Sequence, residues 1–247
     1  MIGNLYIVST PIGNLDDITK RAINTLNSVD IILCEDTRVT KRILNHFQIK
    51  KKLFVYNDIN EHRKANGIID LIFSGSNVAL VSDAGTPCIS DPGYRLVNLA
   101  QNNNIKVLTV PGACSVTAAL SISGLPTDNF FFQGFLPKKK GRHTKFSELA
   151  DLKCSIVLFE SPKRIIKTLH DIEKYFGDRY IAICRELTKI YEEVIFDKIS
   201  PRLFTVKMSS PENFSKQVFA YWGFENPILS QTTLLVMIII SYFSFLY

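Results

Sequence analysis

The chain has 247 residues, of which 46% are hydrophobic and 21% charged, so it can bury a sizeable core as one large or two modest domains. Its formal net charge of +6 permits a polyanionic partner such as RNA without requiring one. The five cysteines are scattered and odd in number, and neither they nor the four histidines show metal-ligand spacing. We therefore expect buried, reduced thiols in a cytoplasmic protein, and no metal site.

The two ends of the sequence differ in character. The first residues, "MIGNLYIVSTPIG", lack the basic stretch and the long apolar region of a signal peptide, so export is not expected. No charged residue follows Glu225, and "LLVMIIISYFSFLY" is an apolar block. This end is interpretable as a marginal tail anchor, a buried final element, or sequence foreign to the original fold. A membrane partner is not our expectation.

The first half of the chain alternates short apolar strands with helices. Strands are predicted at residues 5–10, 30–36, 53–56, 78–83 and 105–112, and helices at 16–29, 37–47, 61–73 and 94–103. Such alternation predicts a mostly parallel sheet covered by helices on both faces. In sheets of this kind, ligands bind beyond the carboxyl ends of the strands.

The pattern changes after Pro126. The aromatic-rich "NFFFQGFLP" is followed by a basic loop, a helix at about 145–152, "SIVLFES", a helix at 163–176 and "YIAICREL". This looser spacing predicts a smaller, mixed α/β domain. The expected division is an N-terminal α/β domain at 1–113, a C-terminal α/β domain at 114–225, and an apolar tail at 226–247.

Three predicted strand ends carry turn-forming residues without any Lys or Arg. They are residues 10–14, 83–93 and 111–115, and all should lie at one edge of the first sheet. Neither a phosphate-binding loop with its Lys nor a G-x-G-x-x-G motif is present. Carboxylates beside Gly and Pro can accept hydrogen bonds from a ribose or an amino group, so they suit a positively charged ligand such as S-adenosylmethionine. Ordinary tight turns are the alternative.

Long motifs in this chain resemble the ribosomal RNA small subunit methyltransferase I family of the tetrapyrrole (corrin/porphyrin) methylase superfamily. The resemblance covers residues 4 to about 195. It is carried by "LYIVSTPIGNLDDITKRAINTLNSVDIILCEDTR", "NVALVSDAGTPCISDPGYRLV", "VPGACSVTAALSISGLPTDNFFFQGFLPKKKGR", "LFESPKRI" and "CRELTKIYEEV". It implies 2′-O-methylation of a decoding-centre cytidine in 16S rRNA of the small ribosomal subunit.

The resemblance also implies a two-domain homodimer that binds S-adenosylmethionine in a cleft between the domains. The cofactor-binding residues it implies are Pro11 and Gly13 in the first loop, Ser82, Asp83, Ala84, Gly85, Thr86 and Pro87 in the second, Pro111, Gly112, Ala113 and Ser115 in the third, and Phe159 and Cys184 in the second domain. A cationic methyl donor would explain why Lys and Arg are missing from these loops.

Charged residues directly after the second strand are our catalytic candidates. A ribose hydroxyl is a poor nucleophile and needs a base or a nearby cation. We expect Glu35 or Asp36 to act as the base or to orient the substrate, and Arg38 to contact a phosphate. Helix N-capping by Asp36 or Thr37 is the alternative.

Basic residues of the second half are the RNA-binding candidates. The densest cluster follows Phe135, and the "LFESPKR" stretch adds two more basic residues. The candidates are Lys138, Lys139, Lys140, Arg142, Lys163 and Arg164. A solvated loop without a ligand is the alternative.

The resemblance fades past Val194, where we expected a final strand that completes the second domain. Loss of that strand would expose an apolar sheet edge. Either the tail substitutes for it, or the reading frame departs from the ancestral one and the product is impaired. Because of this altered end, a non-catalytic RNA- or cofactor-binding remnant is one competing function. A tetrapyrrole-ring methylase is the other, because the superfamily includes such enzymes.

Overall fold

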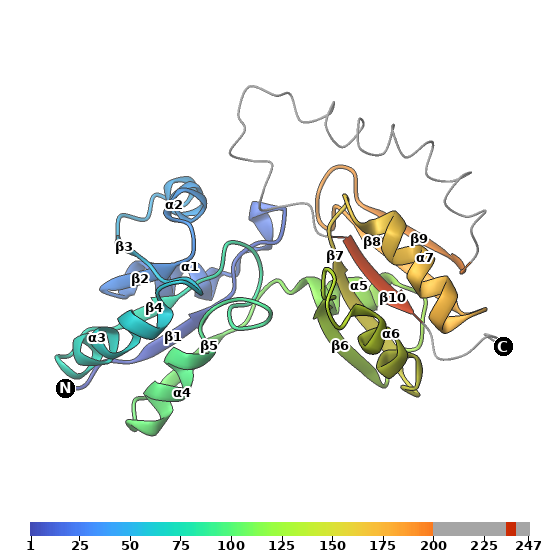
Figure 1. Cartoon of the computed structure of the whole chain (residues 1–247). Helices are drawn as coiled ribbons and strands as arrows, with labels where there is room; N and C mark the ends of the chain where they lie inside the picture. The colour runs from blue at the N-terminus through green and yellow to red at the C-terminus, as the bar shows by residue number, and fades with distance from the viewer. Residues whose placement is uncertain (200–235, 241–247) are drawn as a thin grey trace. The chain divides into compact units, whose positions relative to one another are not determined.

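The computed structural model describes residues 1–199 and 236–240, and the chain divides into two compact units, Met1–Ser115 and Val116–Tyr247 (Figure 1). The described strands of the first unit form a parallel sheet in the order β3-β2-β4-β1-β5. These strands are β1 (Leu5–Val8), β2 (Ile31–Cys34), β3 (Lys52–Val55), β4 (Val78–Leu80) and β5 (Val107–Val110). The predicted parallel sheet is confirmed.

Helices pack on both faces of this sheet because its strands are apolar on both sides. One face is covered by α3 (Glu61–Phe73) and α4 (Tyr94–Asn102), and the other by α1 (Lys20–Ser28) and α2 (Thr37–His46). Burial on two faces is what near-continuous apolar strands of a parallel sheet require.

The first helix begins later than the sequence pattern predicts. The expected helix at 16–29 is divided into a short 3₁₀ turn, η1 (Leu15–Asp17), and α1. The Thr19 side chain accepts a hydrogen bond from the amide of Ala22, so Thr19 is the N-cap of α1. A capping side chain fixes the start of a helix, whereas apolar periodicity alone does not.

The described strands of the second unit form a mixed sheet in the order β6-β7-β10-β8-β9. The strands are β6 (Phe130–Phe135), β7 (Ser155–Glu160), β8 (Tyr180–Arg185), β9 (Glu193–Lys198) and β10 (Val236–Ile240). Only β6 and β7 pair in parallel among them. The helices among the described residues of this unit are α5 (Ser115–Ile122), α6 (Arg142–Ala150) and α7 (Ile165–Phe176), of which α6 and α7 share one core with the sheet (Figure 1).

Part of the apolar C-terminal block lies in the middle of this second sheet. Strand β10 pairs antiparallel with β7 on one side and with β8 on the other, and the side chains from Met237 to Ile240 are buried. Of the three interpretations of the C-terminal end, the described part agrees with a buried final element, which lies between β7 and β8. The rest of the predicted tail lies outside the described residues. Within residues 1–199 and 236–240, no helix has the length and apolar character needed to cross a membrane.

The central position of β10 predicts a large effect of shortening one of its side chains. Ile238 is fully buried, so Ile238→Ala should lower the free energy of unfolding by about 2–5 kcal/mol through lost packing and an unfilled cavity. Urea unfolding of the two proteins measures this difference. Ile190→Ala is the control, because Ile190 is 92% exposed in the same unit. Equal stability of the two variants would contradict the placement of β10.

Candidate active site

The loops that follow β4, β1 and β5 meet at one edge of the first sheet, because these strands are parallel neighbours. Their backbones are joined directly. The amide of Thr10 donates to the carbonyl of Gly85 at 2.9 Å, and the amide of Gly85 donates back to Thr10 at 3.0 Å. The predicted cofactor residues Pro11, Gly13 and 82–87 therefore belong to two loops that are held together.

Side chains extend this connection to the third loop. The hydroxyls of Ser9 and Thr86 lie 3.0 Å apart, and Thr86 donates to the carbonyl of Ala113 at 3.2 Å. Ala113 and its neighbours Pro111 and Gly112 follow β5, and Ser115 begins α5. The structure thus brings all three predicted loops of the first unit into one hydrogen-bonded group.

Glycine is required at the junction of these loops. Gly85 has a φ of +91°, in the left-handed region that other residues avoid, and a Cβ there would lie 3.3 Å from Cγ2 of Ile12. A Cβ at Gly112 would approach Cβ of Ser9 to 3.1 Å. Both positions allow neighbouring loops to come close, a packing role beyond the cofactor-binding role predicted for Gly85 and Gly112 from the sequence.

Glu35 follows β2 and is the unusual carboxyl group of this edge. Its Oε1 atom is buried and has no hydrogen-bond partner in the described part of the chain. Burial, and then the negative charges of Asp91, Asp83 and Asp58, raise the pKa of Glu35 to about 8. A carboxyl group of this kind binds a proton near neutral pH and has an oxygen left to accept a bond from a ligand.

Asp36 is placed differently although it is the next residue. Its side chain caps α2 by accepting from the amide of Arg38 at 2.8 Å, and it pairs with the guanidinium of Arg38 at 2.5 Å. These hydrogen bonds lower the pKa of Asp36 to about 2. Asp36 is therefore a helix cap and a salt-bridge partner, and the side chain of Arg38 stays 64% exposed.

Two more carboxyl groups in the second loop make this edge acidic. Burial raises the pKa of Asp83, which accepts a hydrogen bond from the amide of Asp36 at 3.1 Å. Burial also raises the pKa of Asp91 to about 6, against the opposing effect of a hydrogen bond from Ser82. No set of three or more acidic, Cys or His side chains within the described ranges is arranged to hold a metal ion.

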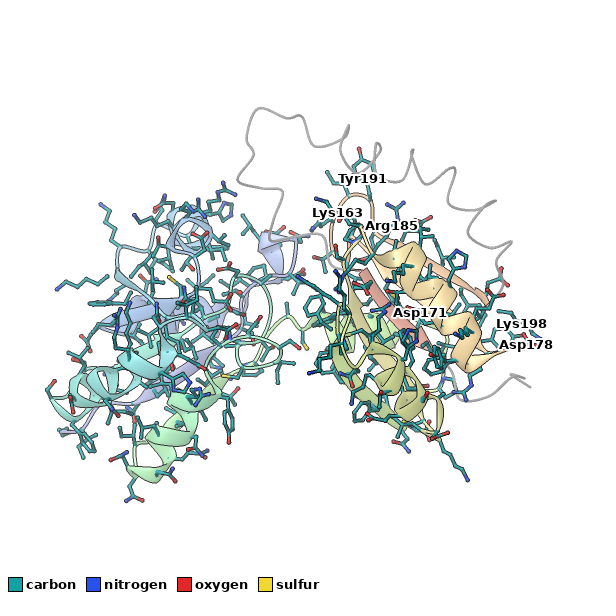
Figure 2. The ribbon with its side chains drawn as sticks, in the orientation of Figure 1. Lys163, Asp171, Asp178, Arg185, Tyr191 and Lys198 are labelled. Atoms are coloured by element: carbon teal, nitrogen blue, oxygen red, sulfur yellow. The ribbon has the colours of Figure 1, made fainter. Side chains whose placement is uncertain are left out.

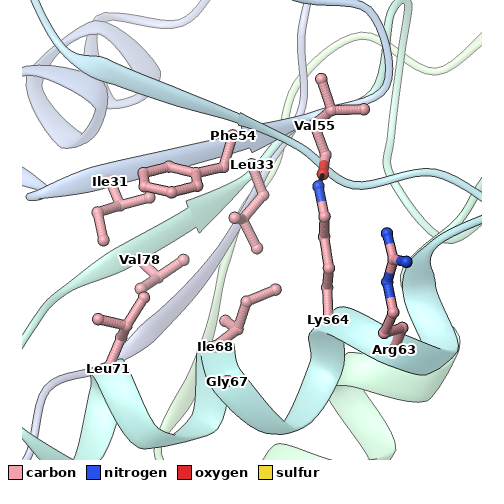
Figure 3. Close-up of a pocket in the computed structure, with 10 residues that line it drawn as sticks. All are labelled: Ile31, Leu33, Phe54, Val55, Arg63, Lys64, Gly67, Ile68, Leu71 and Val78. Atoms are coloured by element: carbon pink, nitrogen blue, oxygen red, sulfur yellow. Dashed lines mark hydrogen bonds between the residues drawn. The ribbon is translucent and has the colours of Figure 1, made fainter.

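A separate apolar pocket of about 510 Å³ lies between α3 and the strands β2, β3 and β4 (Figure 3). Its lining includes Phe54 and Leu71, and Lys64 closes one end by donating to the carbonyl of Val55 at 2.7 Å. None of the predicted cofactor residues lines it. We therefore do not include this pocket in the candidate site.

In the second unit, Phe159 and Cys184 lie in one row across the sheet, with Met237 of β10 between them. Both are buried, and Phe159 makes edge-to-face contacts with Phe132 and Phe135. Burial raises the pKa of the Cys184 thiol to about 12, so it stays protonated. Met237 is a member of this row that sequence reasoning missed, because only the register of β10 reveals it.

The predicted RNA-binding residues fall into two groups. Lys138, Lys139, Lys140 and Lys163 are exposed, and Figure 2 shows Lys163 at the loop before α7. Arg164 is partly exposed and pairs with Glu160 at 2.6 Å. Arg142 is only 5% exposed and donates its hydrogen bonds to protein atoms, so its side chain is not presented to a ligand.

Comparison with known proteins identifies the family of this chain. The profile of the Tetrapyrrole (Corrin/Porphyrin) Methylases matches residues 4–201. Ribosomal RNA small subunit methyltransferase I of Rickettsia prowazekii is 51% identical over 190 residues, which are 76% of this chain and 68% of the relative. Its namesake in Thermotoga maritima is 45% identical over 210 residues, which are 85% of this chain and 95% of that relative. The chain belongs to the ribosomal RNA small subunit methyltransferase I family.

Solved structures agree with this assignment at the level of the fold. A diphthine synthase has a TM-score of 0.66 at 14% identity, covering 97% of this chain and 90% of its own. The cobalt precorrin-4 methyltransferase CbiF has a TM-score of 0.63 at 17% identity, covering 97% and 95%. The predicted tetrapyrrole-methylase fold and the predicted family are both confirmed.

The raised pKa of Glu35 predicts how stability changes with pH. The folded protein holds this proton more tightly than the unfolded chain, so Glu35 should lower stability progressively as pH rises from about 4.5 to about 8. Urea unfolding between pH 5 and pH 9 should show wild type losing stability relative to Glu35→Gln. Asp36→Asn is the control, because the pKa of Asp36 is lowered to about 2, so the difference in stability between this variant and wild type should stay constant from pH 5 to pH 9. A pH-independent difference between wild type and Glu35→Gln would contradict the assignment.

Proposed function

We propose that this chain transfers a methyl group from S-adenosylmethionine to the ribose 2′-hydroxyl of a decoding-centre cytidine in 16S rRNA. The observation that carries the proposal is the identity of about half of the aligned residues with relatives named ribosomal RNA small subunit methyltransferase I. The small ribosomal subunit as substrate, a homodimeric assembly and a cytoplasmic location are parts of the same proposal, and they follow from the resemblance to that family.

The loops at the edge of the first sheet fit a cationic methyl donor. When bound, S-adenosylmethionine supplies an activated methyl group on a sulfonium. The unpartnered Oε1 of Glu35 and the carboxylates of Asp83 and Asp91 would favour such a cation, and no Lys or Arg in the three loops would oppose it. Gly85 lets the first two loops pack closely, and Gly112 is exposed at this edge, where its backbone could face an adenosine or a methionine group. Pro11, Gly13, Ser82, Thr86, Ala113 and Ser115 keep their proposed cofactor roles, as do Phe159 and Cys184.

Among the three catalytic candidates, we assign the role of general base to Glu35. A general base works best when its pKa lies near the working pH, and Glu35 meets this condition better than Asp36. Glu35 would accept the proton of the ribose hydroxyl while the loops align donor and acceptor, since alignment supplies much of the rate in such displacements. Asp36 would hold the guanidinium of Arg38 in place for a phosphate of the RNA.

The exposed lysines at 138–140 and 163 are the proposed RNA-binding surface, with Arg164 at its margin. Neutralisation of phosphates by Lys releases counterions, so binding should weaken steeply with salt. The similarity to relatives named ribosomal RNA small subunit methyltransferase I favours an RNA substrate over a tetrapyrrole ring, the alternative within the superfamily.

Labelled methyl transfer to unmodified small ribosomal subunits tests the proposal. Wild type should place label on one cytidine ribose, located by mass spectrometry of the digested 16S rRNA. Glu35→Gln should lower kcat by about 10² to 10⁴, the usual contribution of a placed proton acceptor. Glu148→Gln is the control, because it removes a carboxylate whose side chain is 55% exposed on α6. Wild-type turnover by Glu35→Gln would exclude it as the base, and absence of label with wild type would exclude the function.

A further inference from the structure

Arg142, the first residue of α6, connects three parts of the second unit through its guanidinium: α6, α7 and the chain at Pro137. Nε donates to Oδ2 of Asp171 at 2.8 Å, Nη1 to the carbonyl of Pro137 at 3.1 Å, and Nη2 to Oγ1 of Thr168 at 2.8 Å. The guanidinium also lies over the ring of Phe146, 5.0 Å from its centroid. Figure 2 shows Asp171 on α7. Arg142 therefore joins α6 and α7 to the chain that precedes the lysine loop, residues 138–140.

The hydrogen bonds continue to the end of β7. Thr168 is fully buried and donates to Oε2 of Glu160 at 2.6 Å. Glu160 is also fully buried, and its Oε1 accepts from the amide of Ser161 and pairs with Arg164. Two guanidinium groups thus balance two carboxylates, which is how a protein tolerates buried charge. Arg142 and Arg164, the two RNA-binding candidates whose side chains are buried or paired, both belong to this network.

The lysine loop is closed by this same side chain. Arg142 holds the carbonyl of Pro137 through Nη1, and its own amide donates to the carbonyl of Lys139 at 3.2 Å. Gly141 has a φ of +76°, which turns the chain back into α6. The guanidinium therefore ties the stem at Pro137 to Arg142 at the other end of the loop, while the three lysine side chains remain exposed.

We propose that Arg142 is a positioning residue for RNA: it holds the lysine loop in its binding shape and does not touch the RNA itself. The proposal rests on the proposed function and explains why a basic residue within the cluster is buried. A loop ordered before binding loses less conformational entropy on binding than a loose one. Lys cannot replace Arg here, because an ammonium group lacks the planar fork that reaches three separated acceptors.

The test compares two Arg→Lys variants. Arg142→Lys keeps the net charge but removes the fork, so the affinity for small ribosomal subunits should fall by about fivefold near physiological salt for each phosphate that the loop no longer neutralises. The slope of log affinity against log salt should become shallower. Affinity for S-adenosylmethionine should stay within twofold of wild type, which a general loss of folding would not allow.

Arg179→Lys is the matched control. Arg179 lies in the same unit, stacks on Phe176 at 5.2 Å and donates to the carbonyl of Ala150 at 2.9 Å. Arg179→Lys also replaces a guanidinium with an ammonium group, but at a position whose hydrogen bond goes to Ala150 rather than to the lysine loop. Subunit affinity and its salt slope should therefore match wild type.

Limited trypsin digestion measures the loop without any RNA. Arg142→Lys should be cut after residues 138–140 at least several times faster than wild type and Arg179→Lys, because its loop is no longer held. Thr168→Val removes the acceptor of Arg142 Nη2 and the hydrogen bond to Glu160 but leaves the sequence of residues 137–142 unchanged, so it should show a smaller change in the same direction. If Arg142→Lys fails to fold, the digestion of Thr168→Val still tests whether this network holds the lysine loop.

The outcomes separate this inference from the function on which it rests. Wild-type protein that neither binds nor methylates small subunits would refute the proposed function, whatever the digestion shows. Functional wild type together with unchanged digestion and unchanged subunit affinity in Arg142→Lys would overturn the positioning role alone. An equal loss of affinity for small subunits in Arg179→Lys and Arg142→Lys would also overturn the positioning role.

Discussion

Parallel pairing of β4, β1 and β5 is the constraint on which the candidate site depends. Parallel strands end at the same edge, so the three loops after them must share one small region. The reciprocal hydrogen bonds between Thr10 and Gly85, and the hydrogen bond from Thr86 to Ala113, then fix the loops to one another. The residues of these three loops that are assigned to the methyl donor take their positions from this arrangement, and Glu35 is added by the neighbouring strand β2.

The carboxyl groups proposed for the methyl donor and the lysines proposed for RNA lie in different units of the chain. Carboxyl groups gather at the edge of the first sheet, where burial makes Glu35 hold a proton near neutral pH, and Lys and Arg are missing from the loops. Lysines gather on an exposed loop of the second unit. Under the proposed function, separate groups of the chain would meet the cationic donor and the polyanionic acceptor, with carboxyl groups near the first and lysines near the second.

Local patterns in the sequence were enough to predict the parallel sheet and the bounds of α3, because apolar periodicity and turn residues report burial and chain reversal directly. They were insufficient for β10, whose pairing partners lie far away in the sequence. Periodicity marked an apolar block without indicating that it fills the centre of a sheet. Only the pairing register places Met237 between Phe159 and Cys184.

Charged residues show a similar limit. The run from Lys138 to Arg142 reads as uniformly basic, yet its last member is buried in an ion-pair network whose partners, Asp171 and Thr168, come from α7. Glu35 and Asp36 are adjacent carboxylates, but one is a buried acid and the other a paired helix cap. Neighbours in space set these properties, so the residue type alone could not separate the roles.

The most direct test of a cationic donor beside Glu35 is calorimetric titration at pH 7 in two buffers that differ in ionisation enthalpy. A sulfonium near the Glu35 carboxyl should lower its pKa, so binding of S-adenosylmethionine should release a proton, and S-adenosylhomocysteine, which lacks the sulfonium charge, should release less. Glu35→Gln should abolish the difference. Equal proton release with both ligands, or no binding of S-adenosylmethionine by wild type, would contradict the account.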